Sequence, residues 1–137
     1  MDEGAKINDG IYTIFDTAAS NIFISVLWFE SFAKQLYSTI GINYEVYKGI
    51  AVATCYAQYP SIYFMIDGYW LQVRPEDYIK ETNEGNCQLK IRPIDAPFNI
   101  MGMPAYVGYY VTHKWGDQAY MTWAPHSESK NQPLLPA

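Results

Sequence analysis

The chain has 137 residues, of which 50% are hydrophobic, 17% aromatic and 17% charged. This length and composition describe one domain with a single core, and they exclude long disordered, collagen-like or coiled-coil segments. A net charge of −5 excludes a basic surface for DNA, RNA or an anionic membrane, and no apolar run reaches the roughly 20 residues that span a bilayer. Thirteen Tyr, six Phe and four Trp favour strands over helices, so we expect a mostly β domain.

Hydrophobic patterns and turn residues predict the elements in chain order. A β-branched and aromatic run at 11–15 predicts a buried strand that ends at Asp16. Ser25 predicts the start of a helix with apolar residues at helical spacing, and Gly41 predicts its end. Further strands are predicted at 44–55, around a Lys48-Gly49 turn, and at 62–66 and 69–73, joined by an Asp67-Gly68 hairpin turn.

The second half of the chain continues the pattern of short strands. Pro75 predicts a helical turn over 75–78, because proline is favoured at the first helical position. An alternating strand follows Cys87 at 88–91, and we expect Pro93 to end it. More strands are predicted at 98–101, 109–112 and 118–123, and the polar residues 126–137 predict a flexible tail.

The two cysteines, Cys55 and Cys87, stand far apart without a CxxC pair or a neighbouring histidine. Zinc sites have closely spaced Cys and His ligands, so we expect no metal site, and no motif indicates a cofactor. From composition alone, a disulfide and two buried thiols remain equally open, because an intracellular chain would keep its cysteines reduced.

Asp16 is the strongest candidate for a catalytic residue in the sequence. It follows an apolar strand and precedes the small residues Thr17, Ala18, Ala19 and Ser20. Such surroundings predict a buried or half-buried carboxylate, and burial raises the pKa of a carboxyl group. The alternative is an Asx turn, in which the Asp16 side chain accepts backbone N–H bonds at the end of a strand.

Five motifs stand in one order along most of the chain. They are the apolar strand with Asp16-Thr17-Ala18-Ala19-Ser20, the pair Cys55 and Cys87, the hairpin from Tyr59-Pro60 to Asp67-Gly68, the turn Pro75-Glu76-Asp77-Tyr78-Ile79, and Ile100-Met101-Gly102. This order resembles the C-terminal lobe of the pepsin-like, or cathepsin D-like, aspartic proteases. The resemblance implies an all-β, antiparallel lobe with one main helix and short helical turns, covering residues 1–125 and followed by the tail.

The resemblance also implies a chemistry. In this family two aspartates, one from each lobe, share a proton; one carboxylate activates a water molecule while the other donates to the scissile carbonyl. Asp16 would be one of the two, with Thr17, Ala18, Ala19 and Ser20 as the loop that supports it. Cys55 and Cys87 would form the disulfide of the lobe, and the substrate would be a peptide.

This sequence departs from the family pattern in several places. Ala18 replaces a glycine of the catalytic loop, Ala19 replaces a threonine or serine whose hydroxyl contacts the carboxylate, and Met103 replaces an aspartate. No second Asp-Thr/Ser-Gly and no Tyr-Gly-Thr-Gly flap segment occurs. The second aspartate must therefore come from an N-terminal lobe or another protein subunit, and pairing of two copies of this chain is the least favoured arrangement.

Two functions follow from these observations. The first is half of an aspartic endopeptidase that needs a second lobe for the other aspartate. The second is a catalytically inactive lobe that acts as a binding or structural subunit. His113 and His126 are expected to be structural residues. The family favours a secretory, lysosomal or digestive-vacuole setting, although the polar, acidic start of the chain predicts no signal peptide within it.

Overall fold

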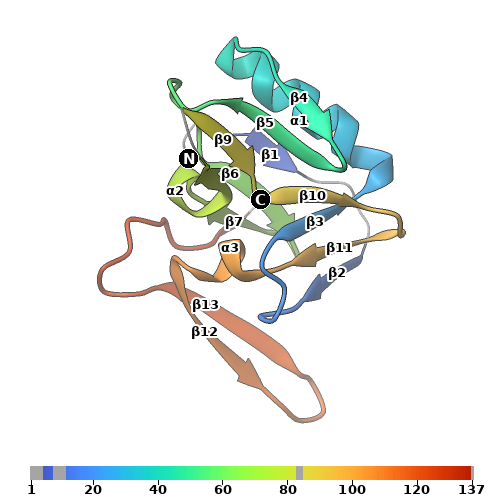
Figure 1. The fold of residues 1–137 in the computed structure, drawn as a ribbon. Helices are drawn as coiled ribbons and strands as arrows, with labels where there is room; N and C mark the ends of the chain where they lie inside the picture. The colour runs from blue at the N-terminus through green and yellow to red at the C-terminus, as the bar shows by residue number, and fades with distance from the viewer. Residues whose placement is uncertain (1–4, 8–11, 83–84, 137) are drawn as a thin grey trace.

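The computed structural model describes residues 5–7, 12–82 and 85–136, which form four small β-sheets and one long helix. Figure 1 shows the helix α1 along one side of the molecule and the hairpin of β12 and β13 projecting from the opposite side. Within these residues, seven strand pairs are antiparallel and three are parallel. The expected all-β lobe with one main helix is confirmed, and no helix of this part of the chain could cross a membrane.

One four-stranded sheet carries the loop that begins at Asp16. Its strands in spatial order are β10 (Ile91–Ile94), β3 (Ile22–Ser25), β11 (Phe98–Met101) and β2 (Tyr12–Phe15). β11 runs parallel to β2 and antiparallel to β3, so it lies between two strands that are consecutive in the sequence. The connection between β2 and β3 therefore crosses the end of β11. This crossing brings residues 16–21 against the residues that follow β11.

Two further four-stranded sheets and a hairpin complete the described strands. One sheet has the order β1 (Ala5–Ile7), β6 (Ile62–Ile66), β7 (Tyr69–Val73) and β14 (Leu135–Pro136). The other has the order β4 (Glu45–Tyr47), β5 (Ile50–Thr54), β9 (Asn86–Leu89) and β8 (Ile79–Glu81). The hairpin is formed by β12 (Tyr109–Lys114) and β13 (Tyr120–Pro125), and the short helices are α2 (Pro75–Tyr78) and α3 (Met103–Tyr106).

The long helix α1 (Val26–Ile40) begins and ends where the sequence predicts. The Ser25 side chain accepts a hydrogen bond from the Leu27 N–H, and Gly41 closes the helix in the left-handed conformation with a φ of +83°. One face of the helix is buried against β3 and β10. The Ser25 N–H also donates to the buried side chain of Asn99 over 2.8 Å, which joins the start of the helix to β11.

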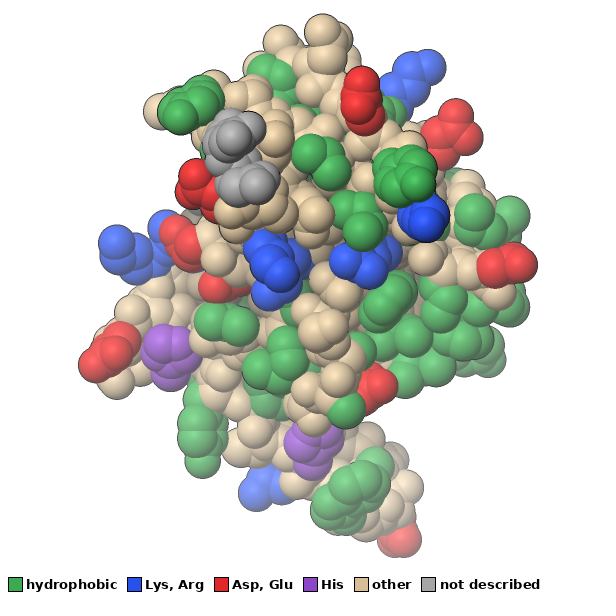
Figure 2. Space-filling view, in the orientation of Figure 1, with side chains coloured by type: hydrophobic (Ala, Val, Ile, Leu, Met, Phe, Trp, Pro, Cys, Tyr) green, Lys and Arg blue, Asp and Glu red, His purple; other side chains and the backbone are tan. Residues whose placement is uncertain are grey.

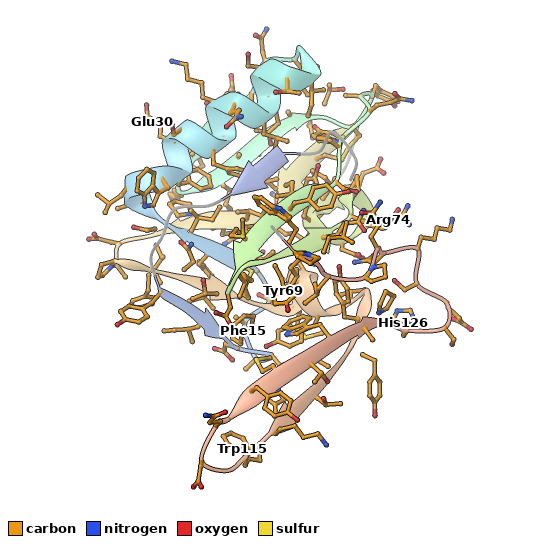
Figure 3. The ribbon with its side chains drawn as sticks, turned by 180° about the vertical axis from the view of Figure 1, so that it is seen from behind. Phe15, Glu30, Tyr69, Arg74, Trp115 and His126 are labelled. Carbon is orange, nitrogen blue, oxygen red and sulfur yellow. A yellow bond between two sulfur atoms is a disulfide. The ribbon has the colours of Figure 1, made fainter. Side chains whose placement is uncertain are left out.

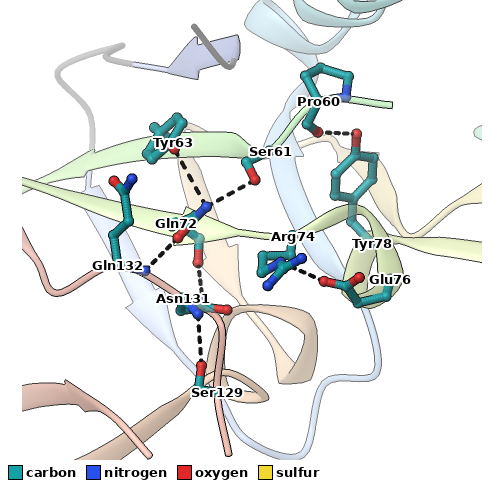
Figure 4. A network of polar contacts seen from close by, with 10 residues as sticks. All are labelled: Pro60, Ser61, Tyr63, Gln72, Arg74, Glu76, Tyr78, Ser129, Asn131 and Gln132. Atoms are coloured by element: carbon teal, nitrogen blue, oxygen red, sulfur yellow. Dashed lines mark hydrogen bonds and ion pairs between the residues drawn. The ribbon is translucent and has the colours of Figure 1, made fainter. Parts of the chain in front are cut away.

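The end of the chain lies against the sheet that contains β7. The Gln132 N–H donates to the Gln72 side-chain oxygen over 2.6 Å, and the Asn131 amide donates to the Gln72 carbonyl over 3.0 Å (Figure 4). The Tyr109 hydroxyl donates to the Gln132 carbonyl over 3.0 Å, and β14 pairs with β7. The described part of the expected flexible tail, residues 126–136, thus has fixed partners, because the buried amide of Gln72 supplies hydrogen bonds that a hydrophobic pattern does not reveal.

Two local predictions are wrong. β2 is an edge strand of its sheet and is not buried: Tyr12 is 85% exposed and Ile14 is 46% exposed, while Ile11 lies outside the described residues. Pro93 does not end its strand but lies inside β10, opposite Ile24. Proline is tolerated there because β10 is the other edge of this sheet, and its missing N–H removes no bond from a central ladder.

Candidate active site

Backbone hydrogen bonds hold both ends of the loop that carries Asp16. The Asp16 N–H donates to the Met101 carbonyl over 3.1 Å, which continues the pairing of β2 with β11. The Ala19 N–H donates back to the Asp16 carbonyl over 3.2 Å, and the Ala19 carbonyl accepts from the Met103 N–H over 2.8 Å. The motif Ile100-Met101-Gly102 therefore lies directly beside this loop.

Gly102 permits the close approach of the two segments. A Cβ atom on Gly102 would lie 2.7 Å from the Ala19 carbonyl oxygen and closer still to the Asn21 carbonyl oxygen. Real Cβ atoms essentially never approach backbone so closely. A side chain at position 102 would therefore push the loop away from the end of β11.

The Asp16 carboxylate is exposed, so the prediction of a buried or half-buried carboxylate is wrong. It accepts a hydrogen bond from the Ala18 N–H over 2.9 Å, which is the Asx turn weighed as the alternative. The exposure follows from the alternation of side chains along an edge strand: Tyr12, Ile14 and Asp16 share the outer face, while Thr13 and Phe15 are half-buried. Among the described residues, no second carboxyl group hydrogen-bonds to Asp16.

The residues that follow Asp16 in the loop differ in their contacts with its carboxylate. The Ala18 N–H donates to the Asp16 carboxylate. Ala19 is half-buried, and both its N–H and its carbonyl form backbone hydrogen bonds. Thr17 and Ser20 are exposed, and the Ser20 hydroxyl accepts a hydrogen bond from the Asn21 amide over 3.3 Å. The loop therefore presents one carboxylate and the hydroxyl groups of Thr17 and Ser20 at the surface.

An aromatic cluster lies next to the loop. Trp123 packs against Phe15, Tyr106 and Tyr109, with ring centroids 5.6, 5.1 and 5.7 Å away, respectively. Burial raises the pKa of the Tyr106 hydroxyl, and the negative charge of Asp16 raises it further. Tyr106 is thus an electrostatic neighbour of the carboxylate that the sequence analysis did not identify. No local motif marks it, since the contact depends on where α3 packs.

An apolar pocket of about 530 Å³ opens on the inner side of β2. Its lining includes Phe15, Tyr69, Leu71, Trp123 and residues of the chain end. Figure 3 shows Phe15 and Tyr69 near the base of the β12–β13 hairpin. Phe15, the last residue of β2, thus contributes its side chain to the pocket, whereas Asp16, the next residue, is not part of the lining.

Cys55 and Cys87 form a disulfide with their Cα atoms 5.1 Å apart. This settles the choice that composition left open, and the expected disulfide of an all-β lobe is confirmed. Cys87 pairs with Ala53 across β5 and β9, so the bond lies at the end of a ladder far in sequence from Asp16. Its role in the structure is to join two strands.

The two histidines have structural contacts. The His126 ring hydrogen-bonds to the Val107 carbonyl over 3.0 Å and accepts from the Glu128 N–H over 3.3 Å. His113 stacks on Trp115 with ring centroids 6.3 Å apart. In the described part of the chain, no group of three or more His, Cys, Asp or Glu side chains could hold a metal ion.

Comparison with known proteins places these features in a family. The family model for eukaryotic aspartyl proteases matches residues 2–122, which include the Asp16 loop, both cysteines, β11 and most of the last hairpin. A search of curated proteins gave no match. One family model thus covers the aspartate loop, the strand that passes beside it and both cysteines. The chain belongs to the eukaryotic aspartyl proteases and forms a pepsin-like lobe.

Proposed function

We propose that this chain supplies one of the two catalytic aspartates, Asp16, of an endopeptidase that cleaves peptide bonds at acidic pH. The observation that carries the proposal is the position of the Asp16 carboxylate. It is exposed, held at its backbone by β11 and oriented by the Ala18 N–H. A carboxylate presented in this way can meet a second carboxyl group from outside the lobe. Residues 1–125 would form the lobe proper.

The expected chemistry follows from placing two carboxyl groups together. Like charges a few ångströms apart cannot both ionise, so the pair holds one proton over a wide range of pH. The ionised carboxylate removes a proton from water as the water attacks the peptide carbonyl, and the protonated carboxyl donates to the carbonyl oxygen. The two apparent pKa values belong to the pair rather than to Asp16 alone.

The surroundings of Asp16 support a partner lobe. Tyr12 and Ile14 on the same face of β2 are 85% and 46% exposed, and Met103 beside the loop is 41% exposed. Large exposed apolar side chains along the strand that leads to an exposed carboxylate are typical of a surface that another protein covers. An N-terminal protease lobe that carries the second aspartate would fit this surface, with a peptide held between the lobes.

A second candidate function rests on the composition of the loop. Ala18 adds a methyl group where the family has glycine, and Ala19 has no hydroxyl group to hydrogen-bond to the carboxylate. A lobe that serves only to bind a partner would tolerate both changes. Under this alternative the chain would assemble with its partner but would not cleave peptides.

The test uses the assembly in which this chain is paired with its second lobe. Asp16→Asn keeps the size and the hydrogen bond from Ala18 but removes the charge, so we expect peptide cleavage at acidic pH to be lost by at least about a thousandfold. Asp95→Asn, at another exposed aspartate in the turn between β10 and β11, should leave the rate unchanged. Cleavage that survives in Asp16→Asn would refute the proposed role, and an assembly that never cleaves would favour the binding function.

A further inference from the structure

A polar hollow lies beside the C-terminal end of the Asp16 loop. The hollow has a volume of about 470 Å³ and is bordered by Ser20 and Asn21 from the loop and by residues of the neighbouring β8, β9 and β10 region. These residues are Lys80, Gln88, Leu89, Lys90 and Arg92. In Figure 2, Lys and Arg side chains gather in the middle of the face shown, over β9 and β10. Three of the nine cationic side chains of an acidic protein thus border one hollow.

These cations are not neutralised within the described part of the chain. The ion pair found there joins Arg74 to Glu76, and the lining of the hollow contains no Asp or Glu. Burial and the charge of Glu76 raise the pKa of the Asp77 carboxyl group, and the nearby charge of Lys90 partly opposes this rise. Asp77 and Lys90 nevertheless do not form an ion pair. The hollow therefore retains an excess of positive charge.

Arg92 contributes a guanidinium group to the lining of the hollow. Its Nε atom is buried and has no hydrogen-bond partner among the described residues. A buried N–H of a charged group without a partner is costly, and such groups in native proteins are usually satisfied by water or an ion. A guanidinium binds tetrahedral oxyanions through two parallel N–H donors, either Nε–H with one Nη–H or one N–H from each Nη.

Backbone hydrogen bonds and strand pairing fix the positions from which the lysine side chains extend. The Lys90 N–H donates to the Tyr78 carbonyl over 2.7 Å, and the Lys90 carbonyl accepts from the Ile22 N–H over 3.0 Å. Lys80 is directly opposite Gln88 in the pairing of β8 with β9, so their side chains lie on the same face of the sheet, beside the hollow. The Ser20 hydroxyl accepts from the Asn21 amide, which leaves the hydroxyl hydrogen free to donate to a ligand.

We propose that the hollow lined by Ser20, Asn21, Lys80, Gln88, Lys90 and Arg92 binds a doubly charged oxyanion of the phosphate class. Three cations match the charge of a dianion better than that of a single carboxylate, and the neutral donors suit its several oxygens. A bound phosphate group would connect the loop that follows Asp16 to β8, β9 and β10. This site does not depend on peptide hydrolysis, so its failure would leave the proposed function untouched.

The first experiment measures the thermal unfolding and the affinity of the full chain for inorganic phosphate, with acetate at matched ionic strength as the reference. Phosphate should raise the midpoint temperature, because a ligand that binds only the folded state stabilises it. Phosphoserine distinguishes the two sources of the group: tighter binding than inorganic phosphate identifies a phosphate ester as the ligand, and equal or weaker binding identifies the free ion. A response to phosphate no larger than the response to acetate would overturn the proposal.

The second experiment locates the site with charge-matched variants. The double variant Lys80→Gln/Lys90→Gln should weaken phosphate binding by at least about tenfold, because charge-assisted contacts are lost. The control Lys34→Gln/Lys114→Gln removes the same charge from exposed positions outside the hollow and should bind as the original protein does. Arg92→Lys keeps the charge but loses the paired N–H donors of the guanidinium, so it should also bind more weakly. Equal weakening in both double variants would refute this site.

Discussion

Replacing Gly102 by alanine tests how closely the Asp16 loop depends on its neighbour. Gly102 has a φ of −90°, which alanine adopts without strain. The added Cβ would instead meet two backbone carbonyl oxygens, at 2.7 Å for Ala19 and closer for Asn21. Neither oxygen belongs to a flexible side chain, so the loop itself must move.

The magnitude follows from the contacts that the movement would break. Forcing an extra methyl group into a packed site costs about 1–3 kcal/mol. Moving the loop also weakens the hydrogen bond between the Met103 N–H and the Ala19 carbonyl, which is worth about 1 kcal/mol. We therefore expect Gly102→Ala to lower the free energy of unfolding by about 3 kcal/mol.

Gly41→Ala is the matched control for this substitution. Its added Cβ would have no atom within 4 Å, but the residue has a φ of +83°. The cost there is backbone strain alone, about 1 kcal/mol, and it is confined to the end of α1. Urea unfolding of both variants gives the comparison, provided that the m-values are unchanged. If Gly102→Ala costs no more than Gly41→Ala, the loop does not pack against position 102 as the structure describes.

Three further predictions concern stability. Tyr37→Phe should raise the free energy of unfolding by about 1 kcal/mol, because the buried Tyr37 hydroxyl has no hydrogen-bond partner among the described residues. Tyr78→Phe should lower the free energy of unfolding by a similar amount, because the Tyr78 hydroxyl donates a 2.5 Å hydrogen bond to the Pro60 carbonyl. Reduction of Cys55–Cys87, which are 32 residues apart, should cost about 3.7 kcal/mol, measured as the shift in urea unfolding with and without reductant. Burial, and then the charge of Glu76, raise the pKa of the Asp77 carboxyl group above its ordinary value of 3.8. The stability that Asp77 contributes is therefore present in acid and is lost as the pH rises through the raised pKa. Asp77→Asn should reduce the fall in the free energy of unfolding between acid and neutral pH, and an unchanged pH profile would contradict this.

Much of the fold could be predicted because the relevant signals are local. The turns at Lys48-Gly49 and Asp67-Gly68 have positive φ at both residues, as two-residue hairpin turns of this kind require. Ser25 is the cap of α1 because a serine side chain can satisfy a free N–H at the start of a helix. Each of these features depends on a few neighbouring residues, so the sequence alone predicts it.

The wrong predictions concern position within the fold. A run such as Tyr12 to Phe15 has the residues of a buried strand, but β2 lies at the edge of its sheet and exposes alternate side chains. Pro93 is accepted in a strand for the same reason, at the opposite edge. Which strand occupies an edge depends on sheet order. That order is created by the insertion of β11 between β2 and β3, which no local pattern reveals.

The partners of the chain end and of Asp16 also depend on residues distant in the sequence. Gln72 reads as an ordinary polar residue of a strand, yet its side chain accepts from Gln132, 60 positions away. The Asp16 loop could be recognised by its motif, but its contacts with Met101 and Met103 arise only when the chain is folded. Arg92 gives no signal in the sequence at all, because its significance lies in a buried nitrogen without a partner among the described residues.

The error about Asp16 strengthens the case for a second lobe. A buried carboxylate could have been satisfied within this chain, whereas the exposed one is hydrogen-bonded on one side and open on the other. It lies at the end of an edge strand whose outer face carries Tyr12 and Ile14. An exposed, apolar edge strand invites association with another chain, and proteins normally cover or charge such edges. One surface therefore presents both the Asp16 carboxylate and exposed apolar side chains. If Asp16 acts as we propose, a lobe that covers Tyr12 would also be positioned to supply the second aspartate.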